Sequence, residues 1–250
     1  MFRGIYAAAS GMVANEMRHS VIANNLANAS TAGFKRNDGL FEGFYQAYLG
    51  RDLHPHLYDV QRGPGGGVRM QQSYTDLQGG PLTTTGDSLN LALTGPGYLV
   101  VDTPQGERYT RNGQLALNEL GQLVTAEGHP LLSDAGTPLT VDGPDFVVDR
   151  AGGVHVAGAL AGQLQVVEFE EPRMLQREGN SLHAAPEEAQ FAPAADTQVL
   201  HKSLEMSNVQ VPNEMVNMLA GLRAYAANQQ VISTFDQTMS RVIDQVGMPS

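Results

Sequence analysis

The stretch ANNLANASTAGFKR, residues 23–36, places three asparagines at the end of what otherwise has the pattern of an amphipathic helix. Asparagine side chains compete with a helical backbone for hydrogen bonds, so their presence needs a reason. Near a helix seam, an amide fixes register and partner choice, because a misaligned neighbour leaves it unpaired. The alternative is a frayed helix end with solvated amides and a C-cap at Gly33. Three amides within five residues favour specific contacts for Asn24, Asn25 and Asn28.

Upstream of this stretch, apolar and small residues keep the alternating three- and four-residue spacing of a coiled-coil seam. The seam consists of Ile5, Ala8, Met12, Ile22, Leu26 and Ala29, and it is interrupted by Asn15 and His19. A second apolar stripe lies beside it, formed by Tyr6, Val13, Met17 and Val21. The apolar surface is therefore wider than one partner helix would cover. The pattern predicts a helix over residues 3–29, about 40 Å long.

The C-terminal end of the chain repeats this pattern. Three- and four-residue spacing, with one phase slip around Gln229, links Met215, Met218, Leu222, Tyr225, Ile232, Phe235, Met239, Val242 and Val246. Pro212 suits the first turn of a helix, and Asn208 or Asn213 is a suitable cap. The pattern predicts a final helix from Pro212 to Val246.

The middle of the chain has the pattern of β-structure. LNLALTGPGYLVV (89–101) alternates like a strand and breaks at a Gly-Pro-Gly turn. Residues 115–124 and 146–156 both read as strand, Asn or Asp, two residues, Gly and strand, which predicts two hairpins with glycine in the turn. LQVVEF (164–169) predicts a further strand, and RGPGGGVR (62–69) a Gly-rich loop.

Helical ends around a β-rich middle predict an α+β fold. The two terminal stripes bury each other most simply as an antiparallel coiled-coil stalk that carries an inserted, mainly antiparallel β-domain. This division gives a discontinuous helical stalk (1–36 with 205–250), an irregular or extended connecting region (37–88 with 184–204) and a β-rich outer domain (89–183).

Composition restricts the function classes. A formal net charge of −11 argues against nucleic acid or an anionic membrane surface as the main partner. The chain contains no cysteine, which excludes disulfides, thiolate catalysis and cysteine-ligated metals. The N-terminus mixes Asn, Glu and Arg into its apolar positions, so no apolar signal-peptide segment is predicted.

No motif predicts a catalytic residue, a cofactor site or a metal site. His54 and His56 offer two ligands, but no third ligand is placed by spacing, which favours a surface loop. The glycines of residues 63–67 lack the Lys-Ser/Thr of a phosphate-binding loop. Three acidic residues lie in or beside the strand at 164–169: Glu168, Glu170 and Glu171. They leave open a glycosidase-like pair of carboxylates, although a charged strand end is the simpler interpretation.

Taken together, the two ends resemble the signatures of the axial family of bacterial flagellar proteins, which comprises rod, hook and hook-associated subunits. Residues 10–36 resemble the N-terminal signature, with its Asn-Asn-Leu-Ala-Asn core followed by Thr-x-Gly-Phe-Lys. Residues 207–239 resemble the C-terminal signature, except that Ala226 stands where the family usually has Glu after Arg-Ala-Tyr. Residues 79–101 and 108–132 resemble the β-domain of the longer rod proteins, the FlgF/FlgG pair.

This resemblance implies a structural subunit of the flagellar basal-body rod, without an active site. Members of the family are exported unfolded by the flagellar type III apparatus without a cleaved signal, and they polymerise into a hollow helical rod that crosses the periplasm. The expected partners are copies of the chain, other rod and hook proteins and the export machinery, with no nucleic acid and no small-molecule substrate. Residues 128–139 favour an FlgF-like proximal-rod protein over an FlgG-like distal-rod or hook-type subunit.

The candidate assembly interface combines the seam residues with residues of the two signatures. It comprises Ile5, Met12, Ile22, Asn24, Asn25, Leu26, Asn28, Phe34, Met215, Met218, Leu222, Arg223, Tyr225, Asn228, Ile232, Phe235 and Met239. Two other hypotheses remain open. One is a helix-tethered hydrolase or carbohydrate-binding β-domain, and the other is a soluble adaptor that forms a small, defined complex.

Overall fold

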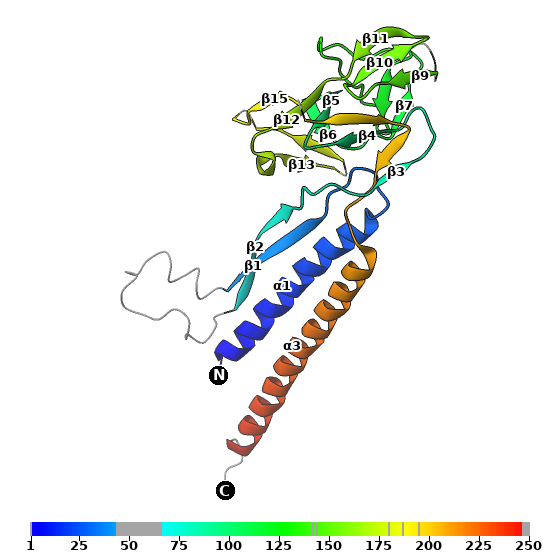
Figure 1. Ribbon diagram of the computed structural model, residues 1–250. Helices are drawn as coiled ribbons and strands as arrows, with labels where there is room; N and C mark the ends of the chain where they lie inside the picture. Colours follow the sequence, from blue (N-terminus) through cyan, green and yellow to red (C-terminus); the bar gives the residue numbers. More distant parts are fainter. Residues whose placement is uncertain are drawn as a thin grey trace. The chain divides into compact units, whose positions relative to one another are not determined.

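The computed structural model describes residues 2–43, 67–141, 143, 145–179, 181–186, 188–194 and 196–246. Within these ranges the protein is α+β, with a helix at each end and antiparallel strands between them (Figure 1). His54, His56 and residues 62–66 of the predicted Gly-rich loop lie outside the described residues. None of the helices in the described ranges has the length and apolarity needed to cross a membrane.

The chain forms two compact units, and each is discontinuous in sequence. The helical unit contains Met1–Leu26, Asn37–Tyr74 and Gln210–Ser250, and the β-rich unit contains Ala27–Arg36 and Thr75–Val209. The chain therefore leaves the helical unit and returns to it twice. The three-part division predicted from the sequence stays a prediction.

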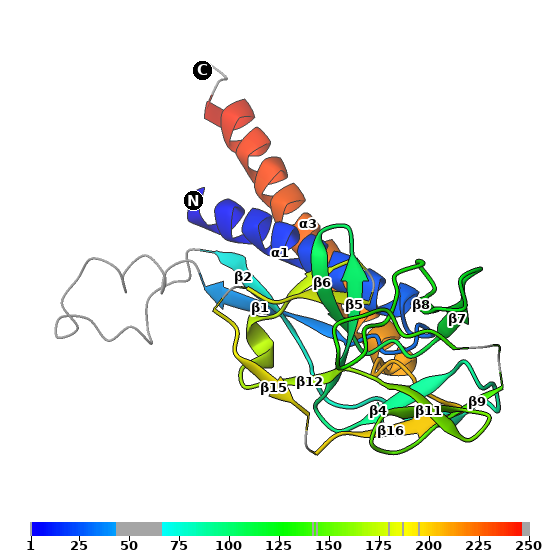
Figure 2. The same cartoon turned by 90° about the horizontal axis from the view of Figure 1, so that it is seen from above.

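The helical unit contains α1 (Phe2–Ala27) and α3 (Val211–Val246), which agree with the predicted helices to within two residues. The two helices lie side by side and run in opposite directions (Figures 1 and 2). A two-stranded sheet of β1 (Asn37–Gly43) and β2 (Val68–Thr75) accompanies α1. Both strands fall in a region that the sequence predicts to be irregular or extended.

Three glycines mark where α1 and α3 approach most closely. A Cβ atom on Gly4 would lie 3.1 Å from Cζ of Phe235, and one on Gly11 would lie 2.8 Å from Nδ2 of Asn228. On Gly221 of α3, it would lie 3.1 Å from Nε2 of His19. In each pair the residue numbers add up to 239 or 240, as expected when two antiparallel helices keep one register. Small residues at these points let the two helices come close together.

The β-rich unit contains one large sheet and several small ones. The six-stranded sheet has the order β13-β14-β6-β5-β12-β15, and a three-stranded sheet has the order β11-β10-β9. Two-stranded sheets are β16-β4, β17-β3 and β7-β8. The strand bounds are β3 (Leu82–Thr84), β4 (Leu91–Thr94), β5 (Tyr98–Thr103), β6 (Gly106–Thr110), β7 (Leu115–Leu117), β8 (Leu123–Thr125), β9 (Phe146–Val148), β10 (Gly153–Val156), β11 (Ala159–Gln163), β12 (Val166–Phe169), β13 (Gln176–Glu178), β14 (Leu182–Ala184), β15 (Phe191–Pro193), β16 (Gln198–His201) and β17 (Ser203–Glu205), with a 3-10 turn at Pro172–Met174.

Two groups of buried side chains hold this unit together. The larger is aliphatic and includes Leu91, Leu123, Leu131, Val154 and Val199. The smaller is aromatic: the ring of Phe169 meets that of Tyr109 edge-on at 4.8 Å and that of Tyr98 at 5.8 Å. Burial of these side chains, at about 25 cal/mol per Å² of apolar surface, is the main source of stability for the unit.

The predicted hairpins are confirmed. β7 pairs with β8, and β9 pairs with β10, both antiparallel. The turn glycines Gly121 and Gly152 have φ angles of +71° and +88°, which favour glycine because it carries no Cβ. The Gly-Pro-Gly break at residues 95–97 separates β4 from β5, as the alternation predicts.

The second region expected to be irregular or extended, residues 184–204, contains β15, β16 and most of β17. The partners of β16 and β17 lie far away in sequence: Val199 pairs with Leu93, and Ser203 with Thr84. The predicted caps of the last helix are wrong, because α3 begins at Val211, so that Asn208 lies too early and Asn213 inside the helix. The residue that precedes the helix is Gln210, whose carbonyl accepts a hydrogen bond from the backbone N–H of Glu214.

Candidate assembly interface

The inner faces of the two helices include polar and small residues as well as apolar ones. Along α1, positions at three- and four-residue spacing that are buried or half-buried are Ile5, Ala8, Met12, Asn15, His19, Ile22 and Leu26. Along α3 the corresponding positions are Glu214, Met218, Gly221, Tyr225, Asn228, Ile232, Phe235 and Met239. Because Gly221 and Asn228 are among these positions, the three- and four-residue spacing is continuous where the sequence alone predicts a phase slip.

The outer faces of both helices expose large apolar side chains. On α3, Met215 and Leu222 of the candidate interface are 54% and 51% exposed, and Arg223 is exposed beside them. The same helix also exposes Val216, Leu219, Val231, Val242 and Ile243. On α1 the exposed stripe contains Tyr6, Val13 and Met17, which belong to the second stripe predicted from the sequence. The helical unit therefore leaves a broad apolar surface in contact with solvent.

The asparagines near the end of α1 have different environments. Asn25 is 1% exposed, and its side-chain amide exchanges two hydrogen bonds with the backbone of Asn37. Nδ2 of Asn25 donates to the carbonyl of Asn37 at 2.7 Å, and Oδ1 accepts from its N–H at 2.9 Å. At the start of β1, the Asn25 amide thus forms the pair of hydrogen bonds that a neighbouring strand would otherwise form. Asn24 is exposed.

Two further interface candidates lie within the β-rich unit. Asn28 is 8% exposed and forms a turn with Thr31, whose N–H donates to the Asn28 carbonyl at 3.1 Å. Phe34 is fully buried, and the guanidinium carbon of Arg177 lies 4.1 Å from the centre of its ring. Such an arrangement of cation over ring is favourable, the more so away from water.

An open apolar groove runs between α1 and β2 in the helical unit. It has a volume of about 340 Å³ and is lined by Tyr6, Ala9, Ser10, Val13, Ala14, Met17, Val68 and Met70. Ser10 joins the two elements, because its hydroxyl donates to the carbonyl of Ala7 and accepts from the N–H of Val68 at 3.1 Å. Gly67 fits against this hydroxyl, since a Cβ there would lie only 2.4 Å from Oγ of Ser10.

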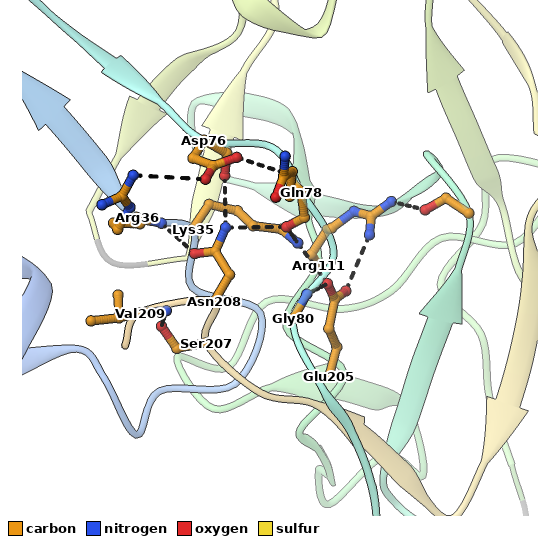
Figure 3. Close-up of polar contacts among 11 residues, drawn as sticks. Lys35, Arg36, Asp76, Gln78, Gly80, Arg111, Glu205, Ser207, Asn208 and Val209 are labelled. Carbon is orange, nitrogen blue, oxygen red and sulfur yellow. Dashed lines mark hydrogen bonds and ion pairs between the residues drawn. The ribbon is translucent and has the colours of Figure 1, made fainter. Parts of the chain in front are cut away.

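The β-rich unit contains a buried charge cluster that the sequence does not reveal (Figure 3). Glu205 is 2% exposed and accepts hydrogen bonds from Lys35 at 2.6 Å and Arg111 at 3.1 Å. The backbone N–H of Gly80 donates to the same carboxylate at 2.9 Å. The second guanidinium nitrogen of Arg111 donates to the carbonyl of Gly95. One carboxylate thus connects segments that are distant in sequence.

Asn208 joins the same segments through its amide (Figure 3). Its Oδ1 accepts from the N–H of Arg36 at 2.7 Å, and its Nδ2 donates to the carbonyls of Asp76 at 3.0 Å and Gln78 at 3.1 Å. Lys35 donates to the Gln78 carbonyl as well, at 2.8 Å. Asn208 and Lys35 therefore hold together the chain segments that pass between the two units, which explains polar residues in both terminal signatures.

Burial lowers the pKa of basic side chains in the β-rich unit, Lys35 and His183 among them. Burial lowers the pKa of the Lys35 ammonium, and the adjacent Glu205 carboxylate opposes this effect. His183 is 6% exposed, and burial together with the charge of Arg177 lowers its pKa from 6.5 to about 4. At neutral pH, His183 is therefore uncharged.

The acidic residues that motivated the hydrolase alternative differ in their exposure to solvent. Glu170 and Glu171 are exposed, Glu168 is half-buried, and the lining of the groove contains no carboxylate. Among the described residues, no group of three or more His, Asp or Glu side chains is arranged to hold a metal ion.

Comparison with known families gives one consistent result. Residues 5–35 match the family described as flagella basal body rod protein, and residues 201–245 match the C-terminal family of the flagellar basal body rod FlgEFG proteins. Residues 92–156 match the D1 domain of the flagellar hook protein FlgE/F/G family. The matched segments coincide with both terminal helices and with part of the β-rich unit.

The chain is also similar to individual proteins over almost its whole length. It is 32% identical over 269 residues to the flagellar hook-basal body complex protein FlhO of Bacillus subtilis, with 99% of each chain covered. It is 32% identical over 255 residues to the basal-body rod protein FlgG of Caulobacter vibrioides, covering 93% of this chain and 95% of that one. FlgF of the same organism is 29% identical over 253 residues, covering 99% of both chains.

Proposed function

The chain belongs to the FlgF/FlgG family of flagellar basal-body rod proteins and is a structural subunit of the rod, and we propose that it assembles through the exposed faces of α1 and α3. The observation that carries this proposal is the apolar surface on those faces. Met215, Leu219 and Leu222 expose more than half of their surface in the single subunit. Exposed apolar patches of this kind mark protein interaction sites.

The inner faces of α1 and α3 pair within one subunit as an antiparallel coiled-coil stalk. Support comes from the three contacts that share one register, Gly4 with Phe235, Gly11 with Asn228 and His19 with Gly221. Successive contacts are seven or eight residues apart on α1 and seven on α3, close to the heptad repeat of a coiled coil. Pairing of the inner faces leaves the outer faces free for neighbouring subunits.

The partners that follow are copies of the chain and other rod and hook proteins. Delivery through the flagellar type III export apparatus is part of this proposal. The chain has no enzymatic role, nucleic-acid partner or small-molecule substrate in this proposal. Its position in the proximal rod rests on residues 128–139, and localisation in purified basal bodies relative to the hook would test it.

Substitution on the outer face of α3 tests the proposal directly. Leu222→Asp places a charge in the apolar surface, so we expect it to abolish sedimentable polymers and rod incorporation. The melting transition of the β-rich unit should not change, because Leu222 belongs to the helical unit. Gln230→Asp is the matched control, since Gln230 is an exposed polar residue of the same helix. Normal assembly of the Leu222→Asp protein would contradict the proposal.

A further inference from the structure

The helix α3 extends past the beginning of α1. Because paired residue numbers add up to 239 or 240, Phe2 at the start of α1 lies opposite residue 237 or 238. The helix α3 continues to Val246, so residues 239–246 lie beyond the residue that faces Phe2, and Figure 1 shows this extension. It is about 12 Å long at the rise of an α-helix. We call it the α3 overhang.

The α3 overhang exposes apolar side chains that pairing with α1 does not cover. Val242 is 47% exposed and Ile243 is 65% exposed. Each costs free energy in contact with water, at about 25 cal/mol per Å² of apolar area. A helix end that carries neighbouring apolar residues is a suitable insert for an apolar groove.

The groove between α1 and β2 matches this insert in chemistry and length. The hydroxyl of Ser10 is a polar group in the lining of the groove, and it is already hydrogen-bonded to the backbone of Ala7 and Val68. From Tyr6 to Met17 the groove follows α1 for about 16 Å, slightly more than the length of the overhang. Its 340 Å³ equals about eleven water molecules at ~30 Å³ each, enough space for more than one aliphatic side chain.

We propose that the α1–β2 groove of one subunit receives the α3 overhang of a second copy of this chain. The overhang cannot fill the groove of its own chain. Val13 lies opposite residue 226 or 227, and Ile243 follows at a distance of about 25 Å along a continuous helix. An α3 overhang that fills this groove therefore comes from another copy.

This pairing is heterologous. Each subunit offers one overhang and one groove, and a contact between two copies uses the overhang of one and the groove of the other. The free groove and free overhang that remain can each bind a further copy, which produces an open helical polymer unless the rotation between copies closes a ring. The inference rests on the proposed function, because it specifies one of the contacts through which subunits assemble.

The natural absence of cysteine makes disulfide trapping unambiguous. An untagged Val13→Cys protein is mixed with a tagged Ile243→Cys protein under assembly conditions, and oxidation is followed by non-reducing electrophoresis. A disulfide requires Cα atoms within about 7 Å, so only copies seated as proposed should form it. The matched control is Val13→Cys with Val216→Cys, because Val216 and Ile243 are both 65% exposed. We expect roughly tenfold more mixed disulfide from the Ile243 pair, given that distance limit.

A second pair, Met17→Cys with Val242→Cys, guards against loss of folding in one variant. Two results would overturn the inference and leave the proposed function standing. One is that the Val216 control forms as much disulfide as the Ile243 pair. The other is that polymers form but neither pair forms a disulfide. If the unsubstituted protein forms no sedimentable polymer under any assembly condition, the inference and the proposed function fail together. Wild-type sedimentation measured in parallel distinguishes the two outcomes.

Discussion

At the scale of single residues, Glu205 is the centre of the buried charge cluster in the β-rich unit. Its carboxylate pairs with two cations that are themselves 3% and 6% exposed, Lys35 and Arg111. Removal of one partner from a buried ion pair leaves the other charge uncompensated in a medium that solvates it poorly. The cluster is thus a structural requirement even where its net contribution to stability is small.

We predict that Glu205→Ala lowers the free energy of unfolding of the β-rich unit by about 3–5 kcal/mol, as for other broken buried pairs. The control is Glu178→Ala, because Glu178 binds Arg108 at the same 2.6 Å but is 48% exposed. That exposed pair should contribute less than about 1 kcal/mol. Urea unfolding followed by tyrosine fluorescence measures both, and equal losses would refute the structural role of the cluster.

His183 gives the β-rich unit a defined sensitivity to acid. Its pKa is about 4 in the folded protein and 6.5 as the ordinary value, so between these pH values the unfolded chain binds a proton that the folded chain does not. The free energy of unfolding therefore falls as pH decreases from 6.5 to 4, by up to about 3 kcal/mol from this group. We predict that His183→Phe, which keeps a ring beside Tyr98, reduces this decrease. Chemical denaturation at pH 7 and pH 4.5 compares the two proteins, and an unchanged pH dependence would contradict the prediction.

At the scale of secondary-structure elements, both helices could be predicted because their apolar spacing is regular over many turns. The glycines at the helix contacts could not, since Gly11 and Gly221 contribute no hydrophobic signal although they permit the closest approaches. The phase slip predicted around Gln229 has the same cause. Because the prediction counted only apolar residues, it assigned the exposed Leu222 to the seam in place of its buried neighbour Gly221.

Short strands whose partners are distant in sequence could not be predicted either. All three residues of β3 are exposed, so the strand lacks the alternation by which a half-buried strand is recognised. It exists because β17, far along the chain, supplies its hydrogen bonds. Glu205 at the end of β17 had no sequence signal, since its two cations lie in other segments.

The contact between Gly4 and Phe235 offers a test of the helix register. We predict that Gly4→Leu disrupts the pairing of α1 and α3, because even a Cβ there would lie 3.1 Å from the Phe235 ring. Phe235→Ala in the same protein should restore much of the loss by making space for the leucine. Far-ultraviolet circular dichroism and amide hydrogen exchange in α1 report the pairing. If both single variants and the double variant show additive losses, the two residues are not in contact.

At the scale of the whole molecule, the two units differ in how much of their apolar surface they bury. The β-rich unit has two buried cores, whereas α1 and α3 leave much of their apolar surface exposed. The second apolar stripe of the N-terminal helix, which is too much for one partner helix to cover, predicted the exposed surface of α1. The sequence did not predict that residues 27–36 belong to the β-rich unit, because Phe34 and Lys35 find their partners only after the chain has folded back.

This contrast predicts a pattern of cleavage by trypsin in the free subunit. Arg18 of α1 and Arg223 of α3 are exposed on helices with few buried apolar contacts, so local opening there requires little free energy. Lys35 and Arg111 are 3% and 6% exposed within the buried charge cluster, and their cleavage requires opening of the β-rich unit. We therefore expect fast cleavage after Arg18 and Arg223 and slow cleavage after Lys35 and Arg111, followed by mass spectrometry over time. In assembled polymers, neighbouring subunits cover the helices, so Arg18 and Arg223 should become resistant. Equal resistance of all four sites in a verified monomer would mean that one subunit already buries its helical surfaces, and no surface would then remain for polymerisation.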